Sequence, residues 1–337
     1  MVTSGIVQML NHASQSVRAD FKKWFDRLPD IDAASWNVIS DYCVGDSSKR
    51  SDAFSFVILL NHGTHEEIAA YIASVAPRDI KHSRGAYQGL LDYLACPVSF
   101  SLNFVVERQS SFLRSILTVE MMQSLTADLR GVVSAWTIEE PPNAGYYGAI
   151  DRRLRLLADE LGRKQASLKL LRQIFLVASF AAIVFSIVDG AKARITIQWI
   201  SDRDAMFDRH DGIAFDLGWL LFQMMRRMHS GFIDLRRPQI AFSSPGMDGV
   251  TEYAEFVRLP DILAGTLADI RLPQVMFSHK KFPPVFNRLF AESPNNAVVE
   301  IVTEDDIVKA RRINFGSSPI GPLTQGPYWR PSSLIIP

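Results

Sequence analysis

An almost wholly apolar run, Phe54–Leu60 (FSFVILL), constrains the fold of this chain more than any other feature. A strand that is apolar on both faces belongs inside a sheet whose two sides are covered. The pattern predicts further strands at Trp36–Tyr42, Val98–Val106, Ile195–Ser201, Gln239–Phe242 and Ala297–Val302. Helical patterns alternate with these strands. We therefore expect an α/β fold with one mixed central sheet flanked by helices, together with an N-terminal helix and an extended C-terminal tail.

The helical patterns have local start and stop signals. Thr64 is predicted to cap a helix that runs to about Ser74, with Glu67 at the capping-box position. A long helix is expected from about Ile150 to Val188, ended by Gly190. The other predicted helices cover residues 4–27, 84–94, 111–129, 212–228 and 256–270, the last one broken near Pro260.

Bulk composition excludes some classes of protein. The 337 residues are 47% hydrophobic and 21% charged, with 36 basic and 36 acidic side chains. A chain with zero net charge is not a general coat for polyanions. Cys43 and Cys96 are the two cysteines, too few for a disulfide framework. The N-terminus shows no signal-peptide pattern, so we expect a cytoplasmic protein.

One segment raises the question of a membrane. Ile174–Val188 holds 15 residues of which Ser179 and Ser186 are polar. That length is below the roughly 20 residues that span a bilayer. A buried core helix is the favoured interpretation, and a membrane-attached protein of unrelated function is the alternative.

The expected organisation has three parts. Residues 1–30 form the N-terminal helix and residues 31–280 the α/β domain. Residues 281–337 form a C-terminal extension whose end, Ser317–Pro337, is rich in Pro, Gly and Ser.

Acidic residues lie where predicted elements end. Asp41 ends the first strand, Asp202 and Asp204 follow the strand Ile195–Ser201, and Asp261 lies in the late helix. By strand parity, Asp202 shares the face of Gln198. Asp261 lies on a helix face of small residues, which permits close approach to a neighbour. Converging carboxylates would bind Mg²⁺ or Mn²⁺, and two such ions could support phosphodiester cleavage.

Each of these acids taken singly has a plainer explanation, because Asp is common at strand ends and helix caps. Asp211, next to His210, is expected to cap the helix that follows it.

The order of the motifs resembles the bacterial domain-of-unknown-function family 3800, which is similar to the RNase H-like superfamily. The resemblance covers roughly residues 34–272. Ile39-Ser40-Asp41 with Phe54–Leu60 matches the opening strands, and Asp79-Ile80-Lys81 matches a Glu-x-Lys motif. Ile195–Asp204 matches the later strand, and the segment from Val257 to Gly265 matches the closing helix. Tyr42-Cys43 replaces the Glu-Ser of the opening motif, Asp79 stands where Glu is usual, and Pro260 replaces a small residue.

The resemblance implies a divalent-metal-dependent nuclease or phosphodiesterase that acts on nucleic acid. It implies catalytic carboxylates at Asp41, Asp79, Asp202, Asp204 and Asp261, with Mg²⁺ or Mn²⁺ held by Asp41, Asp202 and Asp261. Candidates for phosphate contact are Lys81, Arg226, Arg227, Lys280 and Lys281. The alternative is an RNase H-like protein that has lost catalysis and binds nucleic acid or a protein partner.

Overall fold

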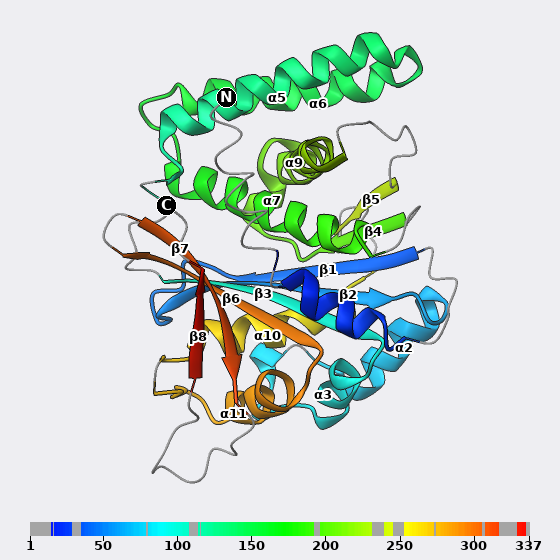
Figure 1. The fold of residues 1–337 in the computed structure, drawn as a ribbon, viewed down its shortest axis with the longest axis vertical. Helices are drawn as coiled ribbons and strands as arrows, with labels where there is room; N and C mark the ends of the chain where they lie inside the picture. The colour runs from blue at the N-terminus through cyan, green and yellow to red at the C-terminus, as the bar shows by residue number, and fades with distance from the viewer. Residues whose placement is uncertain are drawn as a thin grey trace. The chain divides into compact units, whose positions relative to one another are not determined.

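The computed structural model describes residues 15, 17–28, 35–78, 80–107, 114, 116–191, 196–230, 239–244, 253–272, 274–304, 307–316 and 329–334 (Figure 1). The chain divides into two compact units. The helical unit comprises residues 1–12, 111–186 and 203–235. The sheet unit comprises residues 13–110, 187–202 and 236–337. This division differs from the predicted three parts, because described segments beyond residue 280 belong to the sheet unit.

The described residues of the sheet unit form an eight-stranded sheet in the order β5-β4-β1-β2-β3-β6-β7-β8. The strands are β1 (Ser35–Cys43), β2 (Ser51–Leu60), β3 (Ser99–Glu107), β4 (Thr196–Ser201), β5 (Gln239–Ser243), β6 (Asn296–Glu304), β7 (Ile307–Phe315) and β8 (Trp329–Leu334). β1 pairs with β2 antiparallel and with β4 parallel. The sheet is therefore mixed, and the predicted α/β class is confirmed.

The RNase H-like resemblance also predicts that the strands at Trp36–Tyr42 and Ile195–Ser201 are adjacent and parallel in the centre of the sheet, and their adjacency and direction are confirmed. β1 and β4 pair in register from Ser35↔Thr196 to Ser40↔Ser201. The expected central position is wrong. β4 lies directly next to the edge strand β5, whereas β2, β3, β6, β7 and β8 lie on the other side of β1. β2 is buried from Asp52 to Leu60, as its apolar run predicts.

Helices of the sheet unit pack on the sheet face to which odd-numbered residues of β1 point. They are α2 (His65–Val75), α3 (Gln88–Ala95) and α10 (Arg258–Asp269). Ile39, Val57 and Ile200 of the sheet join one core cluster with Ile262 and Leu263 of α10. α10 contacts both β1 and β2 and lies along the sheet in Figure 1.

A helical segment at residues 17–25 packs on the opposite face, to which even-numbered residues of β1 point. Phe21 lies 5.3 Å from Phe100 of β3, measured between ring centroids, and Trp24 lies 6.0 Å from Trp36 of β1. Residues 4–14 of the predicted first helix lie outside the described residues.

Two expectations for the later part of the sheet unit need correction. Pro260 does not break α10 but lies in its first turn, where backbone N–H groups lack intrahelical acceptors and the missing donor is tolerated. Residues 329–334 of the expected extended tail form β8, which pairs with β7 in the sheet. α11 (Phe282–Val285) continues into a π-helical turn, η4 (Phe286–Glu292), which buries Phe286, Leu289 and Phe290.

The helical unit consists of α5 (Val119–Glu139), α6 (Ala144–Leu161), most of α7 (Leu168–Asp189), α8 (Ala205–Asp208) and α9 (Ile213–Ser230), with short turns between them. The single long helix expected from Ile150 to Val188 is wrong, because α6 and α7 are separate helices. Gly162 ends α6, and its N–H donates to the carbonyls of Ala158 and Glu160.

Two buried carboxylates connect elements of the helical unit. Glu160 accepts from Arg209 and His210, and Asp216 accepts from Arg153.

Among the described residues, α7 is the one helix long and apolar enough to cross a membrane. It has 22 residues and extends beyond Ile174–Val188, so the argument from length does not apply. Its most apolar window is 89% buried, as in the core helix of a water-soluble protein. The burial favours the core interpretation, and the absence of membrane attachment stays a prediction.

Thr64 and Glu67 form the predicted capping box at the start of α2, with Oγ1 of Thr64 accepting from the Glu67 N–H at 3.2 Å. We expect Thr64→Ala to lower the free energy of unfolding by about 1 kcal/mol, because one donor of the first turn loses its acceptor. Urea denaturation at pH 7 measures this change. Thr64→Ser keeps the hydroxyl and serves as the control, so an equal loss in both variants would contradict the capping assignment.

Candidate functional site

Asp41 and Asp202 are brought together by the pairing of β1 with β4. The last paired residues are Ser40 and Ser201, and the Asp202 N–H donates to the Ser40 carbonyl at 2.9 Å. This bond completes the last pair of the ladder, and Asp41 and Asp202 are the residues that follow it on the two neighbouring strands. Asp41 is 4% exposed, and its Oδ1 accepts from the Tyr42 N–H at 2.7 Å.

Asp41 lies on the sheet face that α10 covers. It alternates with Ile39 on β1, and Ile39 belongs to the core cluster with α10, as does Ile200 of β4. Gln198, on the same face of β4, donates to the Tyr253 hydroxyl at 2.8 Å, just before α10. The face of Gln198 is thus established, and the predicted parity of Asp202, which follows the end of β4, stays a prediction.

Asp261 lies in the first turn of α10 and is 8% exposed. Gly265 follows one turn later on the same side of the helix. A Cβ added to Gly265 would lie 3.6 Å from the Phe282 ring, so this small-residue side faces α11. The predicted close approach is thus to α11.

The remaining predicted carboxylates have different positions. Asp204 is the N-cap of α8, where its Oδ1 accepts from the Met206 N–H at 2.9 Å. Asp79 lies outside the described residues. Within those residues, no group of three or more His, Cys, Asp or Glu side chains is placed to hold a metal ion. Asp41 and Asp202 are therefore the pair that the strand register brings together.

The two residues that depart from the opening motif lie on opposite faces of β1. The Tyr42 hydroxyl lies 2.5 Å from Ser40 Oγ and 3.1 Å from Ser201 Oγ, away from Asp41. Cys43 shares the face of Asp41. Burial, together with Asp46 and Asp41, raises the pKa of its thiol to about 11, although Lys49 opposes the shift. The thiol is therefore protonated at neutral pH and is a poor nucleophile.

The turn between β1 and β2 is shaped by its own acids. Gly45 has a φ of 76°, a left-handed conformation that suits glycine, and its N–H donates to Asp52 Oδ1 at 2.8 Å. Asp46 Oδ1 accepts from both the N–H and the hydroxyl of Ser48. These bonds fix the backbone of the turn and thereby the position of the next residue, Lys49.

Lys49 and Asp269 form an ion pair that the sequence analysis missed. Lys49 Nζ lies 2.5 Å from Asp269 Oδ1, and the two side chains are 16% and 2% exposed. Ser278 also donates to Asp269, through its N–H at 2.7 Å and through its hydroxyl. Burial by itself would raise the pKa of Asp269, but the bonds from Lys49 and Ser278 outweigh it and hold the pKa below its ordinary value.

A pocket of about 340 Å³ opens around this pair. It is lined by Ser48, Lys49, Arg50, Asp269, Arg271 and Ser278. Three of these side chains are cationic and one is anionic, so the pocket carries net positive charge. Because Ser48, Lys49 and Arg50 lie in the turn that follows β1, the pocket lies at the same end of β1 as Asp41.

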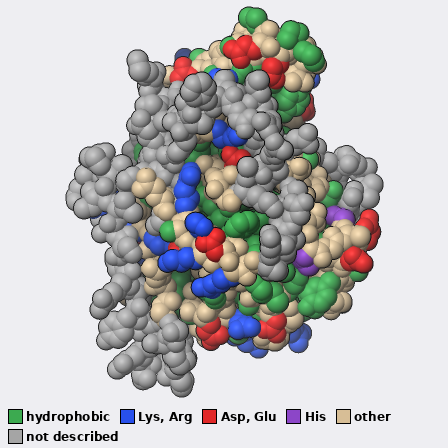
Figure 2. Space-filling view, turned by 45° about the vertical axis from the view of Figure 1, so that its right-hand side comes forward, with side chains coloured by type: hydrophobic (Ala, Val, Ile, Leu, Met, Phe, Trp, Pro, Cys, Tyr) green, Lys and Arg blue, Asp and Glu red, His purple; other side chains and the backbone are tan. Residues whose placement is uncertain are grey.

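The predicted phosphate contacts occupy varied positions. Arg226 and Arg227 of α9 are half-buried and lie over the rings of Phe222 and Trp136. Lys280 is exposed, whereas Lys281 donates to the Ile80 carbonyl at 2.9 Å. The structure does not describe the side chain of Lys81. Figure 2 shows one face on which Lys and Arg side chains gather with few acids among them.

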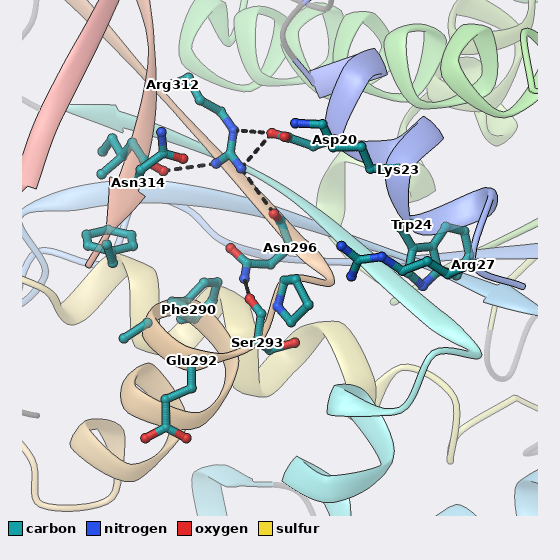
Figure 3. A pocket seen from close by; sticks show the side chains of 14 residues that line it. Asp20, Lys23, Trp24, Arg27, Phe290, Glu292, Ser293, Asn296, Arg312 and Asn314 are labelled. Atoms are coloured by element: carbon teal, nitrogen blue, oxygen red, sulfur yellow. Dashed lines mark hydrogen bonds and ion pairs between the residues drawn. The ribbon is translucent and has the colours of Figure 1, made fainter. Parts of the chain in front are cut away.

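A second pocket, of about 280 Å³, lies between the helical segment 17–25 and β7 (Figure 3). Arg312 is central to it. Its Nε donates to Asp20 at 2.9 Å, and its Nη2 donates to the Asn296 carbonyl at 3.2 Å. Its lining has three cations (Lys23, Arg27 and Arg312) and two acids (Asp20 and Glu292), so it carries less net positive charge than the pocket beside Lys49.

The His210-Asp211 motif belongs to the helical unit and does not cap α9 as expected. α9 begins at Ile213, so Gly212 occupies the position before it. His210 and Asp211 both have positive φ values, and His210 Nε2 lies 2.7 Å from the buried Glu160. The motif therefore serves the packing of α6 against the turn before α9.

No family model, no curated protein and no solved structure matches this chain.

Asp269 allows a test of the pocket's electrostatics. We expect Asp269→Asn to lower the free energy of unfolding at pH 7 by roughly 3 kcal/mol, because Lys49 loses its charged partner. A carboxylate with a lowered pKa stabilises the fold above its unfolded pKa of about 4, and this stabilisation is lost as pH falls. The difference between the two proteins should therefore shrink between pH 5 and pH 3, as urea titrations would measure.

Asp92→Asn is the matched control. Asp92 pairs with Arg288 at 3.2 Å, and its side chain is 51% exposed. A solvent-screened pair of this kind should change stability by less than about 1 kcal/mol. An Asp269 effect that is equally small, or that grows in acid, would contradict the assignment.

Proposed function

We propose that this protein is a divalent-metal-dependent phosphodiesterase that acts on nucleic acid, with an RNase H-like core. The observation that carries the proposal is the in-register parallel pairing of β1 with β4, which ends at Ser40↔Ser201, so that Asp41 and Asp202 follow the last pair on neighbouring strands. The resemblance to family 3800 requires these two strands in one sheet, adjacent and parallel. Asp261 lies on α10, the helix that covers the same sheet face.

The donor chemistry suits a hard cation. Mg²⁺ is usually bound by one or two carboxylates together with substrate phosphates and water, rather than by a closed protein cage. Asp41 and Asp202 would supply those two carboxylates, and Asp79 and Asp261 are the further candidates. A bound Mg²⁺ or Mn²⁺ would supply an activated water and charge stabilisation of the leaving oxygen.

The protein's own residues have separable roles in this proposal. The bond from the Tyr42 N–H orients the Asp41 carboxylate at the end of β1. The cations of the neighbouring pocket would hold the phosphodiester backbone, and electrostatic attraction of this kind positions a strand without reading its sequence. Cys43 takes no part as a nucleophile, because its raised pKa keeps it protonated.

A second candidate is an RNase H-like protein that binds nucleic acid without cleaving it. It is favoured by the finding that, in the part of the chain that the structure describes, no three metal-ligating side chains gather. Tyr42 also stands where the family has Glu, and its hydroxyl is engaged on the opposite face.

Asp41→Asn tests the proposal. Asn keeps an oxygen that can accept from the Tyr42 N–H, so the variant should fold with an unfolding temperature no lower than that of the wild type. We expect cleavage with Mg²⁺ or Mn²⁺ to fall by about 10²–10³ in rate, because one charge that holds the cation is lost. The assay uses labelled single-stranded and double-stranded RNA and DNA, each with both metals.

Asp211→Asn is the control, since Asp211 lies in the helical unit and is exposed. It should retain nearly full activity. Cleavage that survives Asp41→Asn would locate the active site elsewhere. A wild type that cleaves none of the four substrates would reject the phosphodiesterase and leave the non-cleaving binder.

A further inference from the structure

The pocket beside Lys49 has the features of a preformed anion site. Lys49 projects from a turn that is held by Asp46 and Asp52, and its ammonium is fixed by the buried Asp269. Asp269 in turn is held by Ser278. The cation is therefore pre-positioned, and little conformational entropy would be lost when an anion binds.

Two arginines provide the positive charge that Asp269 does not compensate. Arg271 is exposed, and within the described residues its side chain has no ion-pair partner. Arg50 pairs with Glu107 at 3.7 Å, and both side chains are more than a third exposed, so solvent screens that pair. An arginine without a strong partner can offer a bidentate fork of N–H donors to a phosphate.

The position of the pocket identifies its ligand class. Cys43 lies two residues beyond Asp41 on the same side of β1, about 7 Å along the strand. Lys49 lies in the turn that leads from Cys43 into β2, so carboxylates and cations meet at this end of the sheet. A polyanion that crosses the carboxylate pair would place a neighbouring phosphate within reach of Arg271 and Arg50.

We infer that this pocket is a phosphate subsite that holds the backbone of a single-stranded nucleic acid next to the bond over Asp41 and Asp202. The inference rests on the proposed function for the location of the cleaved bond. The binding of the strand by Arg271 and Arg50 needs no metal and no cleavage. The two ideas can therefore fail separately.

The test measures binding in EDTA, where no divalent cation is present. Fluorescence anisotropy follows a labelled 12-nucleotide RNA and its DNA counterpart between 50 and 300 mM salt, with the wild type and Arg271→Gln. Loss of one phosphate contact should reduce the slope of log affinity against log salt by about 0.7 and weaken binding roughly 5- to 10-fold at 50 mM salt. Arg50→Gln should act in the same direction.

Arg288→Gln is the matched control. Arg288 belongs to η4, is 42% exposed and lies near Asp92 and Glu292, outside the pocket. It should leave the affinity and the salt slope unchanged. Binding by the wild type that Arg271→Gln and Arg50→Gln leave unchanged would overturn the subsite, as would a wild type that binds neither strand.

Cleavage assays on the same variants separate the two proposals. Weakened binding by Arg271→Gln in a protein that never cleaves would support the subsite and reject the phosphodiesterase. Cleavage by the wild type with no loss in Arg271→Gln, in binding or in KM, would reject the subsite and keep the phosphodiesterase. Comparison of the two labelled strands shows whether the subsite accepts RNA, DNA or both.

Discussion

The parallel pairing of β1 with β4 is the interaction on which the candidate site depends. Residues Asp41 and Asp202 are 161 positions apart in the chain, yet the register from Ser35↔Thr196 to Ser40↔Ser201 sets them side by side. Side chains alternate along each strand, so a slip of one residue would send one carboxylate to the opposite face. The buried neighbours Ile39 and Ile200 oppose such a slip, because it would remove one of them from the core beneath α10.

The position of α10 depends on polar anchors as well as on its apolar stripe. Asp269 at its last turn is tied to Lys49 in the β1–β2 turn, and Arg258 at its first turn donates to the Ala76 carbonyl at 2.7 Å. A sliding helix would separate Asp269 from Lys49 in a mostly buried setting, which costs several kcal/mol. The same ion pair therefore holds the helix and supplies a wall of the proposed phosphate subsite.

Local patterns predicted most of the sheet and little of the pocket. The strand from Phe54 to Leu60 and the cap at Thr64 have signals within a few residues, and the structure contains both. β7 was missed because its apolar and charged residues do not alternate, as in KARR at positions 309–312. Lys49 and Asp269 are 220 positions apart, and neither a turn lysine nor the last residue of a helix signals a distant partner. The break between α6 and α7 was missed because helical periodicity continues across Gly162.

The charges at this end of the sheet suggest why a cation is needed for the proposed chemistry. Asp41 and Asp202 are neighbouring carboxylates, and like charges at that spacing repel each other and repel a phosphate. Lys49 is paired with Asp269, which offsets most of its charge. Arg271 and Arg50 can attract the nucleic acid to the pocket. The pocket lies beside the carboxylates, so this attraction does not bring a phosphate onto them. A divalent ion between Asp41 and Asp202 would convert the repulsive end of β1 into an attractive one. Binding without metal and cleavage with metal would then depend on different residues of one continuous surface.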